Sequence, residues 1–171
     1  MIELRGALRY SDILRFQYFH TLRKSAWALG VLFLFLGFEW IAPVLLTNWP
    51  EGGLRVALLL CGIMAAVIGI TPYRTARQLW TKQPSLAEEG VIRFSNEGLS
   101  GESPSVTWTY KWPMIRSVQQ TGTAYLLYQS PQAALIVPKR AFVDSAAEED
   151  WLRQIPASIP IHPVSLIGRW F

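Results

Sequence analysis

The side chains that most often carry out catalysis or bind metals are few in this chain. It contains two histidines, His20 and His162, and one cysteine, Cys61. Neither histidine has a second ligand at the spacing that zinc sites use, and a lone cysteine inside an apolar run supports no disulfide or thiol pair. The sequence also has no glycine-rich phosphate-binding loop. It therefore predicts no metal site and no cofactor.

One short motif approaches a catalytic signature without completing it. Residues 98–101 (GLSG) share part of the G-x-S-x-G nucleophile elbow of hydrolases, but they lack its final spacing and its strand-turn-helix context. The acidic cluster Glu148-Glu149-Asp150 is typical of a solvated first turn of a helix, where negative charge is favourable. We therefore predict that the protein is not an enzyme.

Binding is the remaining class of function, and basic and aromatic side chains are its candidates. The candidate contacts for a partner or a lipid headgroup are Lys139, Arg140, Arg116, Trp170 and Phe171. Lys139 and Arg140 follow a strand-like run and a proline, which predicts a loop. Two interpretations stay open for them: general attraction to an anionic membrane surface, worth about 1 kcal/mol for each charge, or specific headgroup binding. The net charge of +4 is carried largely beside two apolar runs, so we predict no nucleic-acid partner.

These two apolar runs lie within the first 73 residues. Ala26–Leu46 contains one charge, Glu39, and Leu54–Ile70 contains one charge, Arg55, near its start. A helix needs about 20 residues to cross a bilayer. The first run has this length, and the second reaches it when residues 71–73 are included. The runs therefore predict a transmembrane helical hairpin over residues 26–73.

A signal peptide and a buried hairpin of a soluble protein both fit the runs less well. A signal peptide has a shorter apolar core that is followed by a cleavage site, whereas the first run here begins only at residue 26. A buried hairpin would show a polar stripe, and these runs are apolar on all sides.

The distribution of basic residues predicts the orientation of the hairpin. They precede the first run and follow the second: Arg5, Arg9, Arg15, Arg23, Lys24, Arg74, Arg77 and Lys82. The connecting loop, residues 47–53, contains none. Basic residues concentrate on the cytoplasmic side of membrane proteins, so we expect both termini in the cytoplasm and a multi-pass protein of the bacterial inner membrane.

Within the hairpin, Glu39 and Arg55 lie one to two turns from the loop. We predict an ion pair between them, with an oligomeric pore or carrier as the alternative reading of an intramembrane charge. Small residues recur at Gly30, Gly37, Gly62 and Gly69, which predicts close packing of the two helices on each other. A contact between copies is the alternative, so a homo-oligomer stays open.

The rest of the chain divides into four segments. Residues 1–25 predict an amphipathic helix that begins near Ser11-Asp12 and lies at the inner membrane surface, or that packs on the cytoplasmic domain instead. Residues 74–89 are a linker, residues 90–155 a cytoplasmic domain, and residues 156–171 a C-terminal tail of open role.

The cytoplasmic domain shows the period-two alternation of strands. The predicted strands are Val91–Ser95, Leu99–Ser100, Val106–Trp112, Ile115–Thr121, Thr123–Tyr128 and Ala134–Val137. A helix capped by Asp144 follows them. The fold class is therefore an α+β membrane protein: a two-helix transmembrane hairpin followed by a small antiparallel β half-barrel with a C-terminal helix.

Several short motifs in this domain resemble those of the YcxB-like family. They are Phe94-x-x-Glu97-Gly98-Leu99, Trp112-x-x-Ile115-x-x-Val118, Ala124-Tyr125-Leu126-Leu127-Tyr128 and Ile136-Val137-Pro138-Lys139-Arg140-Ala141-Phe142. The resemblance extends over residues 10–155. It implies a small bacterial membrane protein with two spans and a cytoplasmic domain related to the pleckstrin-homology (PH) fold. It implies no activity.

The leading hypothesis is a non-enzymatic inner-membrane protein whose cytoplasmic domain binds a protein partner. That partner is a subunit of a membrane complex or an interbacterial toxin, which the protein would neutralise as an immunity protein. The alternative is a membrane-surface sensor that binds anionic lipids.

Overall fold

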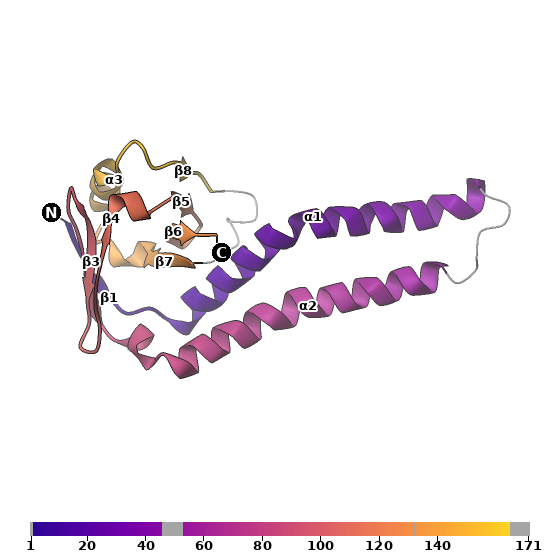
Figure 1. The fold of residues 1–171 in the computed structure, drawn as a ribbon, viewed down its shortest axis with the longest axis horizontal. Helices are drawn as coiled ribbons and strands as arrows, with labels where there is room; N and C mark the ends of the chain where they lie inside the picture. Colours follow the sequence, from indigo (N-terminus) through magenta and orange to yellow (C-terminus); the bar gives the residue numbers. More distant parts are fainter. Residues whose placement is uncertain (1, 46–52, 132, 165–171) are drawn as a thin grey trace. The chain divides into compact units, whose positions relative to one another are not determined.

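The computed structural model describes residues 2–45, 53–131 and 133–164 and shows an α+β chain with two long helices, two sheets and a C-terminal helix (Figure 1). The chain divides into two compact units. One consists of Met1–Phe16 with Ala76–Phe171, and the other of Gln17–Thr75. The first unit is therefore built from segments that lie before and after the long apolar stretch in the sequence.

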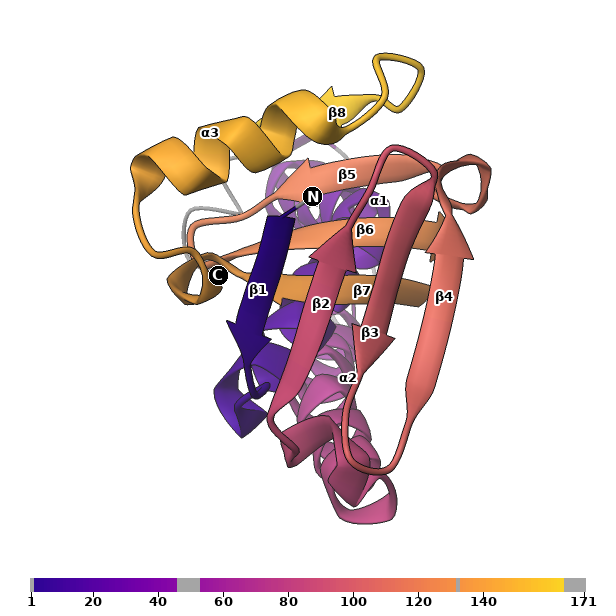
Figure 2. The same ribbon diagram turned by 90° about the vertical axis from the view of Figure 1, so that its left-hand side faces the viewer.

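The first sheet, sheet A, is antiparallel and has the strand order β1-β2-β3-β4. Its strands are β1 (Ile2–Gly6), β2 (Gly90–Phe94), β3 (Gly98–Glu102) and β4 (Thr107–Lys111). Strand β1 pairs with β2 over its full length, from Ile2 opposite Phe94 to Gly6 opposite Gly90. Figure 2 shows this sheet face on.

The second sheet, sheet B, has the order β7-β6-β5-β8. Its strands are β5 (Ser117–Gln120), β6 (Ala124–Ser130), β7 (Ala133–Pro138) and β8 (Ile161–His162). Pairing is antiparallel except between β5 and β8, which are parallel. Figure 2 shows its strands crossing those of sheet A, as in a curved two-sheet sandwich.

Helix α3 (Ser145–Gln154) closes the core between the two sheets. It begins where the sequence predicts, because the Asp144 carboxylate accepts a hydrogen bond from the Ala147 amide at 2.7 Å. Its Trp151 is fully buried, with ring centroids of Tyr125 at 4.7 Å and Phe94 at 5.5 Å. Short 3-10 turns lie at Pro84–Ala87 (η1), Trp112–Met114 (η2) and Lys139–Ala141 (η3).

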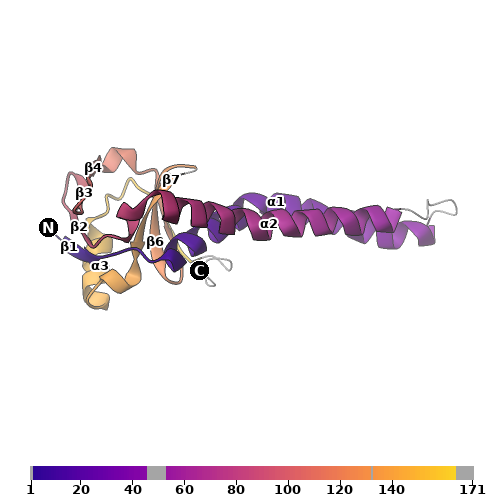
Figure 3. The same ribbon diagram turned by 90° about the horizontal axis from the view of Figure 1, so that it is seen from below.

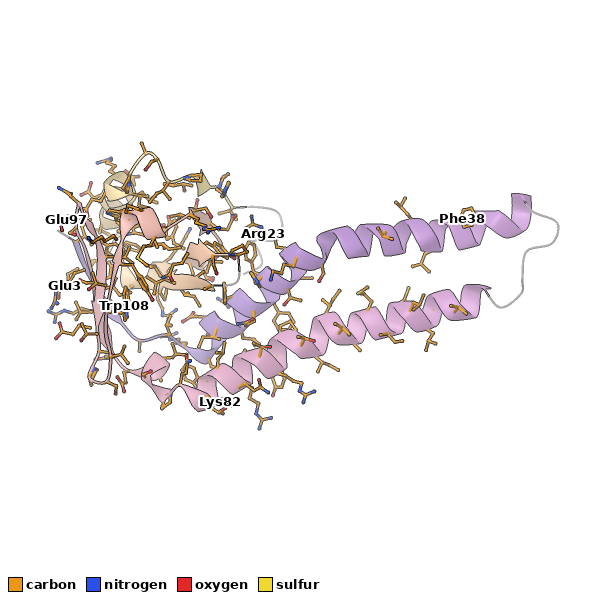
Figure 4. All side chains as sticks on the ribbon, viewed as in Figure 1. Glu3, Arg23, Phe38, Lys82, Glu97 and Trp108 are labelled. Atoms are coloured by element: carbon orange, nitrogen blue, oxygen red, sulfur yellow. The ribbon has the colours of Figure 1, made fainter. Side chains whose placement is uncertain are left out.

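The two long helices are α1 (Tyr10–Leu45) and α2 (Gly53–Lys82), and both are unbroken in Figures 1 and 3. Large apolar side chains of the helical unit are exposed, among them Leu34 at 76% and Leu59 at 64% (Figure 4). Among the described residues, one segment is long and apolar enough to cross a membrane, Leu58–Lys82. The predicted pair of spans is thus supported for its second member, and the two-span hairpin stays a prediction.

The described residues give no support for the predicted close packing at the helix glycines. Among them, an added Cβ at Gly30, Gly37, Gly62 or Gly69 would meet nothing within 4 Å. Small residues permit a close approach of backbones but do not enforce it. The helical unit has a different internal contact: the Tyr18 hydroxyl donates a hydrogen bond to the Gly69 carbonyl at 2.8 Å.

The strands predicted between residues 91 and 137 all form, with small shifts at their ends. Three other segments differ from the sequence prediction. The segment 1–25 holds strand β1 as well as the start of α1, the linker 74–89 is helical to Lys82, and the tail returns as β8. In each case a long-range contact or the continuation of a helix decides the local structure.

Candidate functional site

Arg140, a predicted contact residue, is bound within the molecule. Its guanidinium donates to both carboxylate oxygens of Asp12, at 2.8 and 2.6 Å, and to the Ala7 carbonyl at 3.0 Å. The Asp12 side chain is only 5% exposed, while that of Arg140 is 36% exposed. The hydrogen bond to Asp12 raises the pKa of Arg140. This bidentate pair attaches the start of α1 to the turn η3.

The Asp12 carboxylate also closes the first turn of α1. It accepts a hydrogen bond from the Arg9 amide at 2.7 Å, and the Asp12 amide donates to the Arg9 carbonyl at 2.9 Å. The helix begins at Tyr10, so Asp12 lies within its first turn rather than at the N-cap that the sequence predicts at Ser11-Asp12. The same side chain also binds Arg140. Residues up to Phe16 therefore belong to the same compact unit as the sheets.

Lys139, in the same turn, contacts other residues of the domain. Its ammonium nitrogen lies 3.7 Å from a Glu148 carboxylate oxygen and 5.1 Å from the centroid of the Tyr125 ring. The Tyr125 hydroxyl donates to Glu148 at 2.5 Å. Burial, followed by this interaction with Glu148, raises the pKa of Tyr125 well above its usual range. The Lys139 charge thus joins η3 to α3.

The other predicted contact residues are either exposed or outside the described residues. The Arg116 side chain is exposed, and the described part of the chain provides no ion pair for it. Trp170 and Phe171 lie outside the described residues, as do the side chains of Glu39 and Arg55. The predicted ion pair of Glu39 with Arg55 is therefore still a prediction.

The residues with catalytic potential lie on separate elements. His20 is in α1, His162 in β8 and Cys61 in α2. Ser100 lies within β3, opposite Arg93 and Thr109, rather than in a strand-to-helix turn. Within the described ranges, no group of three or more His, Cys, Asp or Glu side chains is placed to hold a metal ion.

The C-terminal tail belongs to the domain up to the end of the described residues. Ile159 is buried in the core, and the Val118 amide donates to the Pro160 carbonyl at 3.0 Å. The side-chain amide of buried Gln119 donates to the His162 and Pro163 carbonyls at 3.4 and 3.1 Å. Over this range the tail thus covers an edge of sheet B and takes that edge away from a partner.

Strand β4 is the last strand of sheet A, and no strand of the described residues pairs with its outer edge. Its exposed and half-buried residues alternate: Thr107, Thr109 and Lys111 are exposed, while Trp108 and Tyr110 are half-buried against the core. Beside it, Val106 is 44% exposed. The sequence predicts this alternation, but it does not predict that β4 is the last strand of its sheet.

The Trp108 indole lies over Gly101 on β3. An added Cβ at Gly101 would come within 2.1 Å of the ring atom Cζ2, so no larger residue fits there without moving the ring (Figure 4 labels Trp108). Trp108 and Tyr110 have ring centroids 5.2 Å apart. The edge strand therefore carries a fixed pair of aromatic rings on its inner face.

Comparison with known proteins shows a similarity for part of this domain. No curated protein and no solved structure matches the chain. The model of one family, described as YcxB-like protein, matches residues 94–155, a narrower range than the resemblance noted in the sequence. The matched range runs from the end of β2 to the end of α3. Most of the domain, though not the long helices α1 and α2, is therefore similar to YcxB-like proteins.

Proposed function

We propose that this is a non-enzymatic protein anchored in the bacterial inner membrane by two spans, with a PH-related cytoplasmic domain that binds a protein partner. The observation that carries the anchoring is the pairing of β1 with β2. The two strands lie on opposite sides of α1 and α2 in the sequence. Hydrogen-bonded strands of one sheet share one aqueous compartment.

This pairing limits how the helices meet a bilayer. A chain that leaves sheet A after β1 and returns to it at β2 crosses a membrane an even number of times. Because Leu58–Lys82 is long and apolar enough for one crossing, α1 must supply another. At about 1.5 Å per residue, a helix of 36 residues is long enough to extend from the domain through the bilayer.

The charge distribution supports the cytoplasmic side for the domain. Arg15, Arg23 and Lys24 precede the first apolar run, while Arg74 and Arg77 follow the second. The loop between the runs contains no Lys or Arg.

Accessibility of single cysteines tests this arrangement. In a Cys61→Ser background, Asn48→Cys in the loop should react with a membrane-impermeant maleimide in intact cells, because it faces the periplasm. The matched variant Glu97→Cys, on the exposed turn between β2 and β3, should react only after the cells are lysed. Equal labelling of both variants in intact cells would refute the two-span arrangement.

The contacts of Lys139 and Arg140 favour a protein partner over a specific lipid headgroup. Both cations already have carboxylate partners within the domain. A headgroup would have to compete with Glu148 and with the buried Asp12. The outer face of sheet A, in contrast, offers exposed side chains such as Arg5 and Glu102 without disturbing the core.

Crosslinking in the membrane tests the partner hypothesis. The tagged full-length protein is crosslinked in cells, purified and analysed for stoichiometric companions by mass spectrometry. One recurrent protein partner supports the proposal, and a toxin would assign the immunity role. Recovery of the chain with enriched anionic lipid but without any protein would overturn it in favour of a membrane-surface sensor.

A further inference from the structure

Each of the two sheets has two edge strands, and they differ in how they are protected against pairing. On sheet A, β1 carries the charged residues Glu3 and Arg5, and Arg140 binds the Ala7 carbonyl just beyond it. On sheet B, β7 has an irregular register near Ser130 and ends in Pro138, while β8 has two residues. Charges, bulges, prolines and short length all discourage strand addition. Strand β4 has five residues, a regular register and a single charge, Lys111.

The hydrogen bonds around β4 show which of its backbone groups are free. The Trp112 amide donates to the Glu97 carbonyl at 3.2 Å, and the Ser103 amide donates to the Val106 carbonyl at 2.9 Å. Hydrogen-bonded and non-hydrogen-bonded pairs alternate along an antiparallel ladder. The amides and carbonyls of Trp108 and Tyr110 therefore face β3. Those of the exposed residues Thr107, Thr109 and Lys111 face away from the sheet.

We propose that β4 pairs with β4 of a second copy of this chain, antiparallel and centred on Thr109. In this register, Thr109 lies opposite Thr109 of the other copy, and Thr107 lies opposite Lys111. These are the residues whose backbone groups point outward, so each such pair can exchange two hydrogen bonds. Registers centred between two residues would place an outward-pointing residue opposite an inward-pointing one. Of the registers centred on a residue, the one on Thr109 pairs all three exposed residues of β4 with one another.

The side chains of the outer face fit this register. Lys111 lies opposite the uncharged Thr107 of the other copy, so the two lysines do not face each other. On β3, Glu102 lies beside Thr107 and its side chain is 59% exposed. The Lys111 ammonium of one copy is therefore brought near the Glu102 carboxylate of the other. This charge complementarity favours a second copy over a partner of unspecified sequence.

The inner face fits as well. In the same register, Trp108 lies opposite Tyr110 of the other copy, at a non-hydrogen-bonded position, where side chains approach most closely. Both rings are half-buried in the single chain. Cross-strand aromatic pairs contribute favourably to sheet pairing. Pairing would thus bury the four rings of the two copies more completely than the rings are buried in the single chain.

A contact through one strand is small and would be weak between freely diffusing proteins. Anchoring both copies in one membrane raises their effective concentration. The inference rests on the proposed membrane anchoring for this effect, but it requires no particular protein partner.

Disulfide crosslinking of the full-length protein in inner-membrane vesicles tests the register. In the Cys61→Ser background, Thr109→Cys should give a dimer with copper phenanthroline, because paired Cα atoms would lie about 5.5 Å apart. Thr107→Cys alone should stay monomeric, since its counterpart would be about 14 Å away along the strand. The double variant Thr107→Cys/Lys111→Cys should again give the dimer.

A proline substitution supplies a second test that leaves the β3–β4 ladder intact. Thr109→Pro removes an amide that faces away from the sheet, whereas Thr109→Val retains it. With the crosslinking cysteines at positions 107 and 111, the proline variant should lose most of the dimer and the valine variant should keep it. Trypsin resistance of the domain shows that the proline variant is folded.

Two outcomes would overturn the proposal. One is a Thr109→Cys protein that stays monomeric although it resists carbonate extraction and is therefore anchored in the vesicle membrane. The other is equal crosslinking at positions 107 and 109, which indicates random collision. Loss of the protein from the membrane fraction would instead refute the anchoring, so the two failures are distinguishable.

Discussion

Sheet B is covered on both faces, whereas sheet A is covered on one. In β6, every residue from Ala124 to Tyr128 is buried, although successive side chains of a strand point to opposite faces. Tyr125 and Leu127 face the core cluster. Tyr128 faces the other way and lies against Phe16 of α1, with ring centroids 6.5 Å apart. In β4 of sheet A, exposed and half-buried residues alternate.

This difference predicts which substitutions affect the stability of the domain and which affect its contacts with other molecules. Sheet B packs against the core on one face and against the start of α1 on the other, so changes in it should affect the whole domain. The outer face and the β4 edge of sheet A carry polar side chains, so changes there should affect contacts with other molecules and leave the fold intact. The predictions below test this division from the largest effect to the smallest.

The largest effect is expected in the centre of sheet B. Leu127 is fully buried, and Leu127→Ala should destabilise the domain by about 2–5 kcal/mol because it removes buried apolar contacts and leaves a cavity. Pulse proteolysis of the full-length protein in nanodiscs measures this. Thr109→Ala on sheet A is the matched control and should change stability little. A similar loss in both variants would contradict the division of roles.

The next effect concerns the attachment of α1 to η3. Arg140→Ala should destabilise the domain by about 1–3 kcal/mol, because it leaves the nearly buried Asp12 carboxylate without its cation. Hydrogen exchange of residues 2–12, measured by mass spectrometry on the full-length protein, should increase most.

A double-mutant cycle separates this pair from general damage. Asp12→Asn combined with Arg140→Ala should cost less than the sum of the two single changes, since the double variant leaves neither charge of the pair without its partner. Strict additivity would show that the pair is not coupled. Loss of anionic-lipid binding by Arg140→Ala without loss of stability would restore the lipid interpretation of this residue.

How much of this was visible in the sequence depends on contact range. The alternation of Val106–Trp112 and the cap at Asp144 are local patterns, and both predict the observed elements. Strand β1 was missed because its alternation is short and its partner follows only after both long helices. Likewise, the sequence predicts Arg140 as a contact for a partner or a lipid and not its pair with Asp12, because the two residues are 128 positions apart.

The candidate edge shows the same limit. The sequence marks Thr107, Thr109 and Lys111 as the outward side of a strand, which the structure confirms. Whether their amides are free depends on the strand order, and no local pattern specifies it. The tail was missed for the same reason: Ile161 and His162 form β8 only because β5 offers a parallel partner.

A smaller effect is expected from Tyr125 on the inner face of sheet B, and it depends on pH. Folding raises the pKa of the Tyr125 hydroxyl, chiefly because the hydroxyl is buried. The neutral hydroxyl therefore contributes stability that is fully present below the pKa of about 10 that tyrosine has in the unfolded chain. This contribution is lost as pH rises above that value, because the unfolded chain then ionises first. Tyr125→Phe should therefore flatten the decline in stability between about pH 10 and 11.

The same variant has a second, pH-independent consequence. It removes the hydrogen bond to Glu148, so at neutral pH it should cost about 1 kcal/mol. Denaturation in a pH series measures both effects at once. An unchanged alkaline decline in Tyr125→Phe would show that other groups cause it. Tyr110→Phe on sheet A, whose ring is only half-buried, serves as the matched control.

The smallest effect is expected on the outer face of sheet A, although this face carries the most visible ion pairs. Arg93 lies 3.4 Å from Glu3 and 2.9 Å from Glu102, and its pKa is raised, chiefly by the hydrogen bond to Glu102. All three side chains are solvent-accessible, and such pairs contribute little because water and salt screen them. Arg93→Gln should leave the unfolding midpoint unchanged at physiological salt.

The same variant frees Glu102, so under the proposed pairing of β4 it should strengthen the attraction of Glu102 for Lys111 of the second copy. Crosslinking of Thr109→Cys should then increase at low salt and match the parent at high salt. A fall in crosslinking would mean that Arg93 itself, rather than Glu102, faces the neighbouring copy.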